Sequence, residues 1–338
     1  MGSLNIDDIA RLAGVSKSTV SRVLNNPALV SEITQKKVNS IIEEHDFYPN
    51  HAARTLSNRS SGIIAVIVSE INNEYFGNLL LGIAEVTDDL GLTMMIFNTD
   101  NSYKKEKKIF EALRGYYVEG ILYTPSIKYN SKKEEKHIAD FINKINVPII
   151  LMDREMQYHK YDGVYFNDLD AMYEATKLFI EKGHKKIGIV SGDFEGSLIS
   201  NRDDGVYRAM RESGLKLNHE DILRCDYSVE AACDVTLERF KRPNPPTAFL
   251  LGNNHIALGF LKAINKMKMK LNIDVECIGI DKIPSIDYID YGYSFIERDS
   301  KYLGIKAMEL LLDKIDNPED QVKSIFLPAP VNYKMKKV

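Results

Sequence analysis

Apolar residues recur at helical spacing in three stretches near the start of the chain. Residues 6–13, 17–25 and 31–44 each place apolar side chains three or four positions apart, so that one face of a helix is buried. Gly14 separates the first two stretches and allows the positive φ that a tight turn needs. Ser16 is a good N-cap for the second. The pattern predicts a helix-turn-helix with a third supporting helix.

The pattern changes after residue 62, where short apolar runs alternate with longer amphipathic stretches. The predicted strands are 63–68, 93–98, 120–124, 148–153, 186–191, 247–251 and 275–280. The predicted helices lie near 74–90, 103–115, 132–145, 168–183, 200–214, 228–240, 254–268 and 299–315. Because the strands are apolar throughout, they indicate doubly wound parallel sheets covered on both faces, an α/β fold.

This series divides near residue 162 into two similar halves. One half opens at residue 63 and the other at residue 186, each with a strand followed by a helix. Two α/β lobes that face each other form a cleft outside the carboxyl ends of their strands. We therefore expect a ligand site between two lobes.

The second stretch leaves a row of polar side chains on its outer face. Lys17 and Ser18 begin this helix, and residues there enter the major groove in helix-turn-helix proteins, so both are candidates for reading bases. Arg22, one turn later, could bind a guanine with two hydrogen bonds. Contacts to phosphate, or a role in holding the helix, are expected of Thr19, Ser21 and Asn25. The alternative for Thr19 and Ser21 is capping or solvation, and for the whole row a solvated face.

A short segment follows the third helix. Pro49 stops the preceding structure, and Asn50 can cap a helix of about two turns before residue 58. So short a helix is marginal in water by itself. We expect it to form only when something packs against it.

Residues 8–25 and 48–56 together carry a specific motif. They resemble the headpiece of the lactose-repressor/galactose-repressor family of bacterial transcription regulators, and the resemblance extends over essentially the whole chain. It implies a helix-turn-helix domain at 1–48, a hinge helix and linker at 49–61, and a periplasmic-binding-protein-like core at 62–338. The implied core has lobe one at about 62–162 and 293–322, and lobe two at about 163–292 and 323–338. The segment 293–297 would then return to lobe one as a strand.

The resemblance also implies a role for the hinge helix on DNA. In the family this segment folds in the minor groove against its dimer mate, and a leucine from each chain wedges into the central base step. Leu56 matches that leucine, and Asn50, Ala53 and Arg54 lie on the same segment. An inserted apolar residue can unstack and kink DNA, which widens the minor groove. The alternative is that Leu56 is a linker residue that packs on the core.

Effector contacts in the family come from strand ends and adjacent loops. The matching residues here are Tyr75, Phe76, Asp153, Arg202, Asn253 and Asp281. Carboxylates, an arginine and an amide can bind vicinal hydroxyls, and an aromatic ring can cover a sugar, so the set suits a sugar or a sugar derivative. The alternative is that Asp153 and Asp281 cap helices or pair with Arg154 and Lys282.

Two positions depart from the family pattern. Asn254 stands where an aspartate is usual, and Lys282 stands where an acidic or amide residue is usual. Both changes remove negative charge near the cleft. One hypothesis is therefore an anionic ligand, such as a sugar phosphate or a sugar acid. The alternative is drift at outward-facing positions.

Composition limits the remaining possibilities. The apolar and charged fractions, 44% and 27%, are those of a globular protein, and the net charge is −4. Residues 1–60 hold seven Lys and Arg against six Asp and Glu, so DNA affinity should depend on dimerisation and specific contacts. Three cysteines without metal spacing, no secretory signal and no membrane-spanning run predict a cytoplasmic protein.

Competing functions are less well supported by the sequence. It has no nucleotide-binding glycine motif, no nucleophile elbow and no catalytic or zinc spacing among its seven histidines, so we expect neither an enzyme nor a cofactor. A transport-type binding protein would lack the headpiece. A global regulator with a phosphorylated carrier protein as co-effector stays open. We expect a homodimer on palindromic operator DNA, with an interface on the helix near 74–90 and its lobe-two counterpart, and no tetramer because no leucine heptad follows residue 333.

Overall fold

The computed structural model describes residues 4–47, 61–127, 132–193, 197–319 and 321–334, without the side chains of 25 and 197–200. The chain forms two compact units, Met1–Ser61 and Gly62–Val338. The boundary between them in the sequence coincides with the predicted start of the core. The predicted hinge residues Asn50, Ala53, Arg54 and Leu56 lie outside the described residues.

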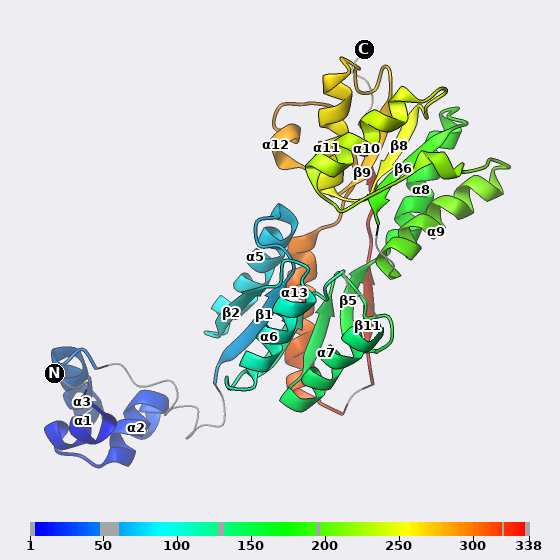
Figure 1. Cartoon of the computed structure of the whole chain (residues 1–338). Coiled ribbons are helices and arrows are strands. Elements are labelled where there is room, and N and C mark those ends of the chain that lie inside the picture. The colour runs from blue at the N-terminus through cyan, green and yellow to red at the C-terminus, as the bar shows by residue number, and fades with distance from the viewer. Residues whose placement is uncertain (1–3, 48–60, 128–131, 194–196, 320, 335–338) are drawn as a thin grey trace. The chain divides into compact units, whose positions relative to one another are not determined.

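The first unit is a small three-helix domain (Figure 1, blue). Its helices are α1 (Ile6–Ala13), α2 (Lys17–Asn25) and α3 (Glu32–Glu44), with a short 3-10 turn at Pro27–Leu29. Gly14 has φ 61° at the end of α1, and the Ser16 side chain accepts a bond from the Thr19 amide at the start of α2. The predicted turn and cap are therefore present.

A compact apolar core holds these helices together. Ile9, Ala13, Val20 and Val38 are fully buried, and α1 packs against both α2 and α3. Because α2 buries only its inner side, Lys17, Ser18 and Arg22 remain exposed. The helix-turn-helix thus presents the predicted polar row to its surroundings.

The second unit contains two six-stranded sheets. We call the first, with its helices, lobe one; its strand order is β11-β5-β4-β3-β1-β2, and all of its pairs are parallel. The strands are β1 (Ile63–Val68), β2 (Thr93–Asn98), β3 (Gly120–Tyr123), β4 (Ile149–Met152), β5 (Asp162–Phe166) and β11 (Ser324–Leu327). The helices are α5 (Glu74–Asp89), α6 (Tyr103–Leu113), α7 (Lys132–Ile145) and α13 (Ser300–Asp316).

Lobe two is the second sheet with its helices. Its strand order is β12-β10-β9-β8-β6-β7, in which β12 alone pairs antiparallel. The strands are β6 (Ile187–Gly192), β7 (Ile222–Cys225), β8 (Ala248–Leu251), β9 (Glu276–Ile280), β10 (Ser294–Ile296) and β12 (Val331–Asn332). The helices are α8 (Asp168–Glu181), α9 (Ser197–Glu212), α10 (Val229–Lys241), α11 (Asn254–Lys266) and α12 (Pro284–Asp287), with a 3-10 turn at His219–Asp221.

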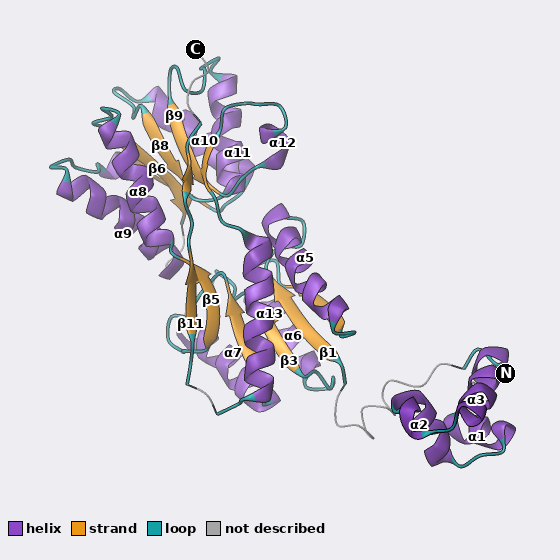
Figure 2. Cartoon of the chain, turned by 180° about the vertical axis from the view of Figure 1, so that it is seen from behind, coloured by secondary structure: helices purple, strands orange, loops and turns teal. Residues whose placement is uncertain are grey.

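Helices cover both faces of each sheet, as the continuous apolar strands predict. Along β1, Ile64 and Val66 join the core shared with α5 and α13, whereas Ala65 and Ile67 join the core shared with α6 and α7. Figure 2 shows α5 and α13 together on one side of lobe one. In lobe two, α8 pairs with α9 and α10 pairs with α11. No described helix is long and apolar enough to cross a membrane.

The predicted lobe boundaries need correction. The segment 293–297 does not return to lobe one, because Phe295 pairs with Gly279 and so places β10 beside β9 in lobe two. Residues 162–166 and 324–327 form adjacent strands of lobe one, not of lobe two. The chain therefore changes lobe directly after β5, β10 and β11. A short buried strand does not reveal its partner from its own sequence, so local pattern could not assign these three segments.

Candidate functional site

Polar residues follow strands of both lobes at the edge where the lobes meet. Asp153 comes directly after β4 and Asp281 directly after β9, and their φ angles of 67° and 72° turn the chain out of each sheet. Asn253 follows β8 and caps α11 by accepting a bond from the Ile256 amide. Parallel strands thus deliver these side chains to one edge, as expected for a doubly wound fold.

One pocket between the lobes has an empty volume of about 350 Å³. Its lining includes all six residues predicted from the sequence, namely Tyr75, Phe76, Asp153, Arg202, Asn253 and Asp281. It also includes Arg154, named from the sequence as a possible partner of Asp153, and Asn254, named as a departure near the cleft. The residues not foreseen from the sequence are Asn73, Ile127, Tyr227 and Arg298. The structure therefore brings the predicted set together and adds two further arginines.

Arg298 is one of the two added arginines, and its hydrogen bonds reach both lobes. It lies between β10 and α13, where the chain changes lobe, and its side chain is only 4% exposed. Nε and Nη2 donate to the two carboxylate oxygens of Asp281, each at 2.8 Å, and Nη1 donates to Asp153 Oδ1 at 3.0 Å. Asp281 therefore pairs with Arg298, and the alternative pairing with Lys282 is not found, because Lys282 binds Asp287 at 2.8 Å.

Arg202 is held within lobe two. Its Nε donates to Asp168 Oδ2 at 2.7 Å, and its Nη1 donates to the Gly252 carbonyl at 2.9 Å. Asp168 is buried, and its second oxygen has no hydrogen-bond partner among the described residues. Burial disfavours the charged form of Arg202, but Asp168 raises its pKa above the usual value, so Arg202 stays charged.

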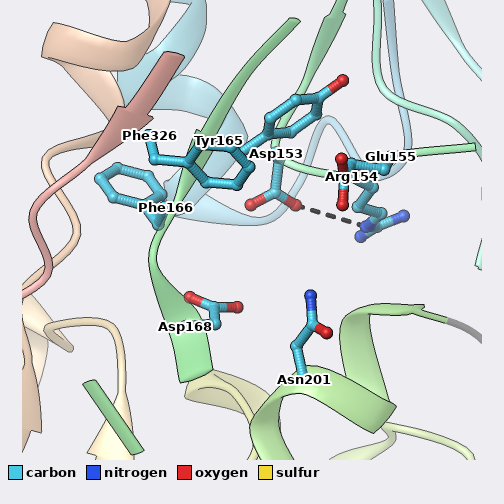
Figure 3. A pocket seen from close by; sticks show the side chains of 8 residues that line it. All are labelled: Asp153, Arg154, Glu155, Tyr165, Phe166, Asp168, Asn201 and Phe326. Carbon is cyan, nitrogen blue, oxygen red and sulfur yellow. Dashed lines mark ion pairs between the residues drawn. The ribbon is translucent and has the colours of Figure 1, made fainter. Parts of the chain in front are cut away.

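Arg154 is the third arginine of the site. Its Nη1 donates to Ser69, Asn101 and the Pro125 carbonyl at 2.9–3.0 Å, which fixes the side chain on lobe one. Its Nε lies 3.3 Å from Asp153, so the alternative pairing of these two residues is present. Figure 3 shows a neighbouring pocket of about 310 Å³, in which Asp153 and Arg154 face Asp168 and Asn201 of lobe two.

The two strand-end aspartates differ electrostatically. Burial alone would raise the pKa of Asp153, but Arg298 and Arg154 outweigh it, so the pKa of this carboxyl is lowered. Burial raises the pKa of Asp281, and the like charge of Asp153 adds to that effect against the opposing influence of Arg298. Three largely buried aspartates and three largely buried arginines thus meet, and each arginine contacts at least one aspartate.

A pair of amides also joins the lobes. Asn73 of lobe one and Asn254 of lobe two exchange hydrogen bonds of 2.8 and 3.3 Å. Asn254 therefore lies in the pocket, whereas Lys282 lines a different, adjoining pocket. Of the two departures that suggested an anionic ligand, only Asn254 lies in the pocket described above.

The polar row of α2 is only partly free. Lys17 Nζ lies 2.9 Å from Asp7, and the hydroxyls of Ser18 and Thr19 each lie 2.8 Å from the Ser16 hydroxyl. Thr19 thus takes part in the helix cap, which was its alternative role. Arg22 makes no ion pair with any described residue. Among the described residues there is also no group of His, Cys, Asp or Glu side chains that could hold a metal ion.

Comparison with known proteins identifies the family. Residues 5–50 match the model of bacterial regulatory proteins of the lacI family, and residues 61–337 match periplasmic binding proteins and the sugar binding domain of the LacI family. The transcriptional repressor PurR of Vibrio campbellii (strain ATCC BAA-1116) is 32% identical over 96% of both chains. PurR of Vibrio vulnificus (strain CMCP6) is 31% identical, also over 96% of both.

Solved structures agree with this fold. The lac repressor dimer bound to operator and the anti-inducer ONPF has a TM-score of 0.87, is 22% identical and covers 100% of both chains. The complex of the transcriptional regulator CelR with cellobiose has a TM-score of 0.72, is 20% identical, and covers 98% of this chain and 99% of its own. The relatives are repressors, which confirms that this protein is not an enzyme. The chain therefore belongs to the lacI family, and it is a DNA-binding transcriptional repressor.

Proposed function

We propose that a small polar ligand, held in the pocket between the lobes, controls this repressor. The observation that carries the proposal is the convergence of Tyr75 and Asp153 from lobe one with Arg202, Asn253 and Asp281 from lobe two on one pocket. A ligand that contacts both lobes binds one lobe arrangement more tightly than another. Such differential affinity is what allows a ligand to shift a two-state equilibrium.

The chemistry of the pocket favours a sugar or a sugar derivative, and we propose that class as the effector. Arg202 and Asn253 supply hydrogen-bond donors, and Tyr75 and Phe76 supply aromatic surface next to them. Structural neighbours are described in complex with cellobiose and with ribose. On this basis the regulated genes would serve carbohydrate use, and the ligand would be neutral or would carry a phosphate or a carboxylate.

We further propose that α2 reads a palindromic operator. Arg22 has no described ion-pair partner and is exposed, so its guanidinium is available for a guanine edge. Lys17 and Ser18 lie at the start of the same helix, where base contacts are usual in this motif. The hinge residues named above would contact the minor groove.

The experiment is selection of operator sites from random DNA, with and without a panel of sugars, sugar phosphates and sugar acids. We expect an enriched palindrome whose binding one compound strengthens or weakens. Arg22→Ala should lose preference at one base of each half-site, while Arg11→Ala, on an exposed side chain of α1, serves as the matched control. Absence of any enriched palindrome would contradict the operator proposal, and an operator that no compound affects would contradict the effector proposal.

We also propose that the repressor works as a homodimer. Leu81 on α5 and Tyr288 with Ile289 after α12 are apolar and exposed to 61%, 84% and 68%. Association of two copies through these side chains would remove their apolar surface from water, which favours the dimer. Light scattering coupled to size exclusion should give twice the chain mass, and a monomer or a tetramer would contradict the proposal.

A further inference from the structure

The side chain of Arg298 is bound as a ligand would be bound. Its edge meets Asp281 through two hydrogen bonds and Asp153 through a third, all of 2.8–3.0 Å. The Tyr75 hydroxyl donates to the same Asp153 oxygen at 2.7 Å and so fixes the carboxylate. Two bonds from one carboxylate to a planar guanidinium form the geometry that specifies arginine over lysine.

Aromatic rings complete the enclosure. The guanidinium carbon lies 4.6 Å from the ring centre of Tyr75 and 5.3 Å from that of Phe166, within the range of cation–π attraction. Asp168 lies 3.7 Å from Nη1 and adds a third carboxylate. Carboxylates and aromatic rings at these distances make a complete receptor for a guanidinium group. We call Tyr75, Asp153, Phe166, Asp168 and Asp281 the guanidinium box.

The box is divided between the lobes. Tyr75, Asp153 and Phe166 belong to lobe one, whereas Asp168 and Asp281 belong to lobe two. Arg154 offsets the charge of Asp153, and Arg202 offsets that of Asp168, but each of these pairs lies within one lobe. Without Arg298, the buried carboxylates of opposite lobes would have no described cation bridging them and would repel each other more strongly. Arg298 is thus the arginine of the site whose carboxylate partners come from both halves of the box, and it favours their approach.

We propose that Arg298 acts as a built-in ligand, which holds the two lobes together through the guanidinium box when no small molecule is bound. In the ligand-free protein, the two lobes are then held together by Arg298. An effector then binds in a cleft that Arg298 already bridges. It contacts Arg202, Arg154 and Asn253, which lie beside Arg298. The proposal goes beyond the effector's identity and does not depend on it.

The test measures the distance between the lobes in the full chain, without DNA or effector. Spin labels are attached through D140C on α7 and K266C on α11, two exposed positions of lobe one and lobe two. The native cysteines Cys225, Cys233 and Cys277 are buried. The labelled protein is measured with the native Arg298 and with Arg298→Ala, in rising methylguanidinium chloride. Methylammonium chloride and N-methylurea at the same concentrations are the probe controls.

We expect one narrow distance distribution with Arg298, unaffected by any probe at millimolar concentration. Arg298→Ala should give a broader and longer distribution, and methylguanidinium should restore the narrow one with a saturable dose response. Methylammonium should restore it at least tenfold less effectively, and methylurea not at all. Arg208→Ala, an exposed arginine that pairs with Glu212 at 3.0 Å, is the matched variant and should leave the distribution unchanged.

Several results would overturn the proposal. They are an unchanged distribution in Arg298→Ala, no restoration by methylguanidinium, or equal restoration by methylammonium. If the single variant fails to fold, the double variant Arg298→Ala with Asp281→Asn is used, because it has less uncompensated charge. The double variant should give the broad, long distance distribution and should not respond to methylguanidinium. A narrow distribution in the double variant would count against the proposal. Operator selection and effector response are separate assays, so failure there would leave this result standing.

Discussion

Two buried arginines, Arg239 and Arg298, show what the surroundings of an ion pair decide. Arg239 on α10 is fully buried and contacts Asp221 at 2.7 Å and the Asn244 carbonyl at 3.0 Å. Arg298 is also buried and also binds aspartate with short bonds. The partners named for Arg239 lie in lobe two, whereas the partners of Arg298 come from both lobes.

This difference changes what happens when each pair is broken. Water can reach Asp221 only if the packing of lobe two is disrupted, because the carboxylate is fully buried within one lobe. Asp153 and Asp281 line the pocket between the lobes, so water can reach them when the lobes separate there. The same kind of ion pair therefore stabilises the fold of lobe two at Arg239 and controls the separation of the lobes at Arg298.

The largest effect is expected for Arg239→Met. It leaves Asp221 buried with Lys186, at 3.5 Å, as its remaining cation among the described residues. Removal of one partner from a buried pair costs about 3–5 kcal/mol. Urea unfolding measures the loss. A decrease in unfolding free energy below about 1 kcal/mol would mean that the network is not structural.

A smaller effect is expected for Arg298→Gln. Its aspartate partners can regain water when the lobes separate, so the loss should be about 1–3 kcal/mol, the cost of unsatisfied polar groups. The same urea titration checks it. If Arg298→Gln lowers the unfolding free energy as much as Arg239→Met does, the proposed difference between the two ion-pair networks is wrong.

The contrast also predicts a dependence on pH. The pKa of Asp153 in the folded protein lies below its unfolded value of about 3.9. Its charged form therefore stabilises the fold above that value, and this contribution disappears as the pH falls through the folded pKa. Unfolding free energies of wild type and Asp153→Asn should differ at pH 7 and converge below about pH 4. A difference that stays constant over this range would disprove the assignment.

The smallest effect is expected for Arg208→Ala. Arg208 and Glu212 pair on the surface of α9 at 3.0 Å, and both side chains are more than 40% exposed. Exposed pairs of this kind contribute little, since both groups keep water in the unpaired state. The urea midpoint should not change measurably. A clear loss would show that exposure is a poor guide to the importance of ion pairs in this protein.

Local pattern was enough to predict most elements, and the family resemblance supplied the pocket residues. The apolar run of β1 and the cap at Ser16 have signatures within a few residues, and both are present. Asp153 and Asp281 were predicted from the family resemblance, and each does directly follow a buried parallel strand, at the cleft edge. The strand pattern and the helix cap depend only on residues that lie close together in the sequence.

Arg298 and the lobe changes could not be predicted in this way. The resemblance placed 293–297 in lobe one, so nothing pointed to the arginine that follows as a cleft residue. A signal did exist, since Glu297, Arg298 and Asp299 are charged and directly follow a buried strand, as Asp281 does. What was missing is the pairing of β10 with β9, which joins distant parts of the chain.

The triple change of lobe has a consequence for synthesis on the ribosome. Lobe one begins at Ile63, yet the last strand of its sheet is Ser324–Leu327. One face of this sheet is also not fully covered until α13 has been synthesised. That strand emerges roughly 160 residues after β5, on the order of ten seconds or more of translation. The nascent chain therefore carries an incompletely covered apolar face of this sheet from the synthesis of β5 until that of α13. The lobe that starts first is thus not completed until nearly the whole chain has been made, and a chaperone that shields it would act during that interval.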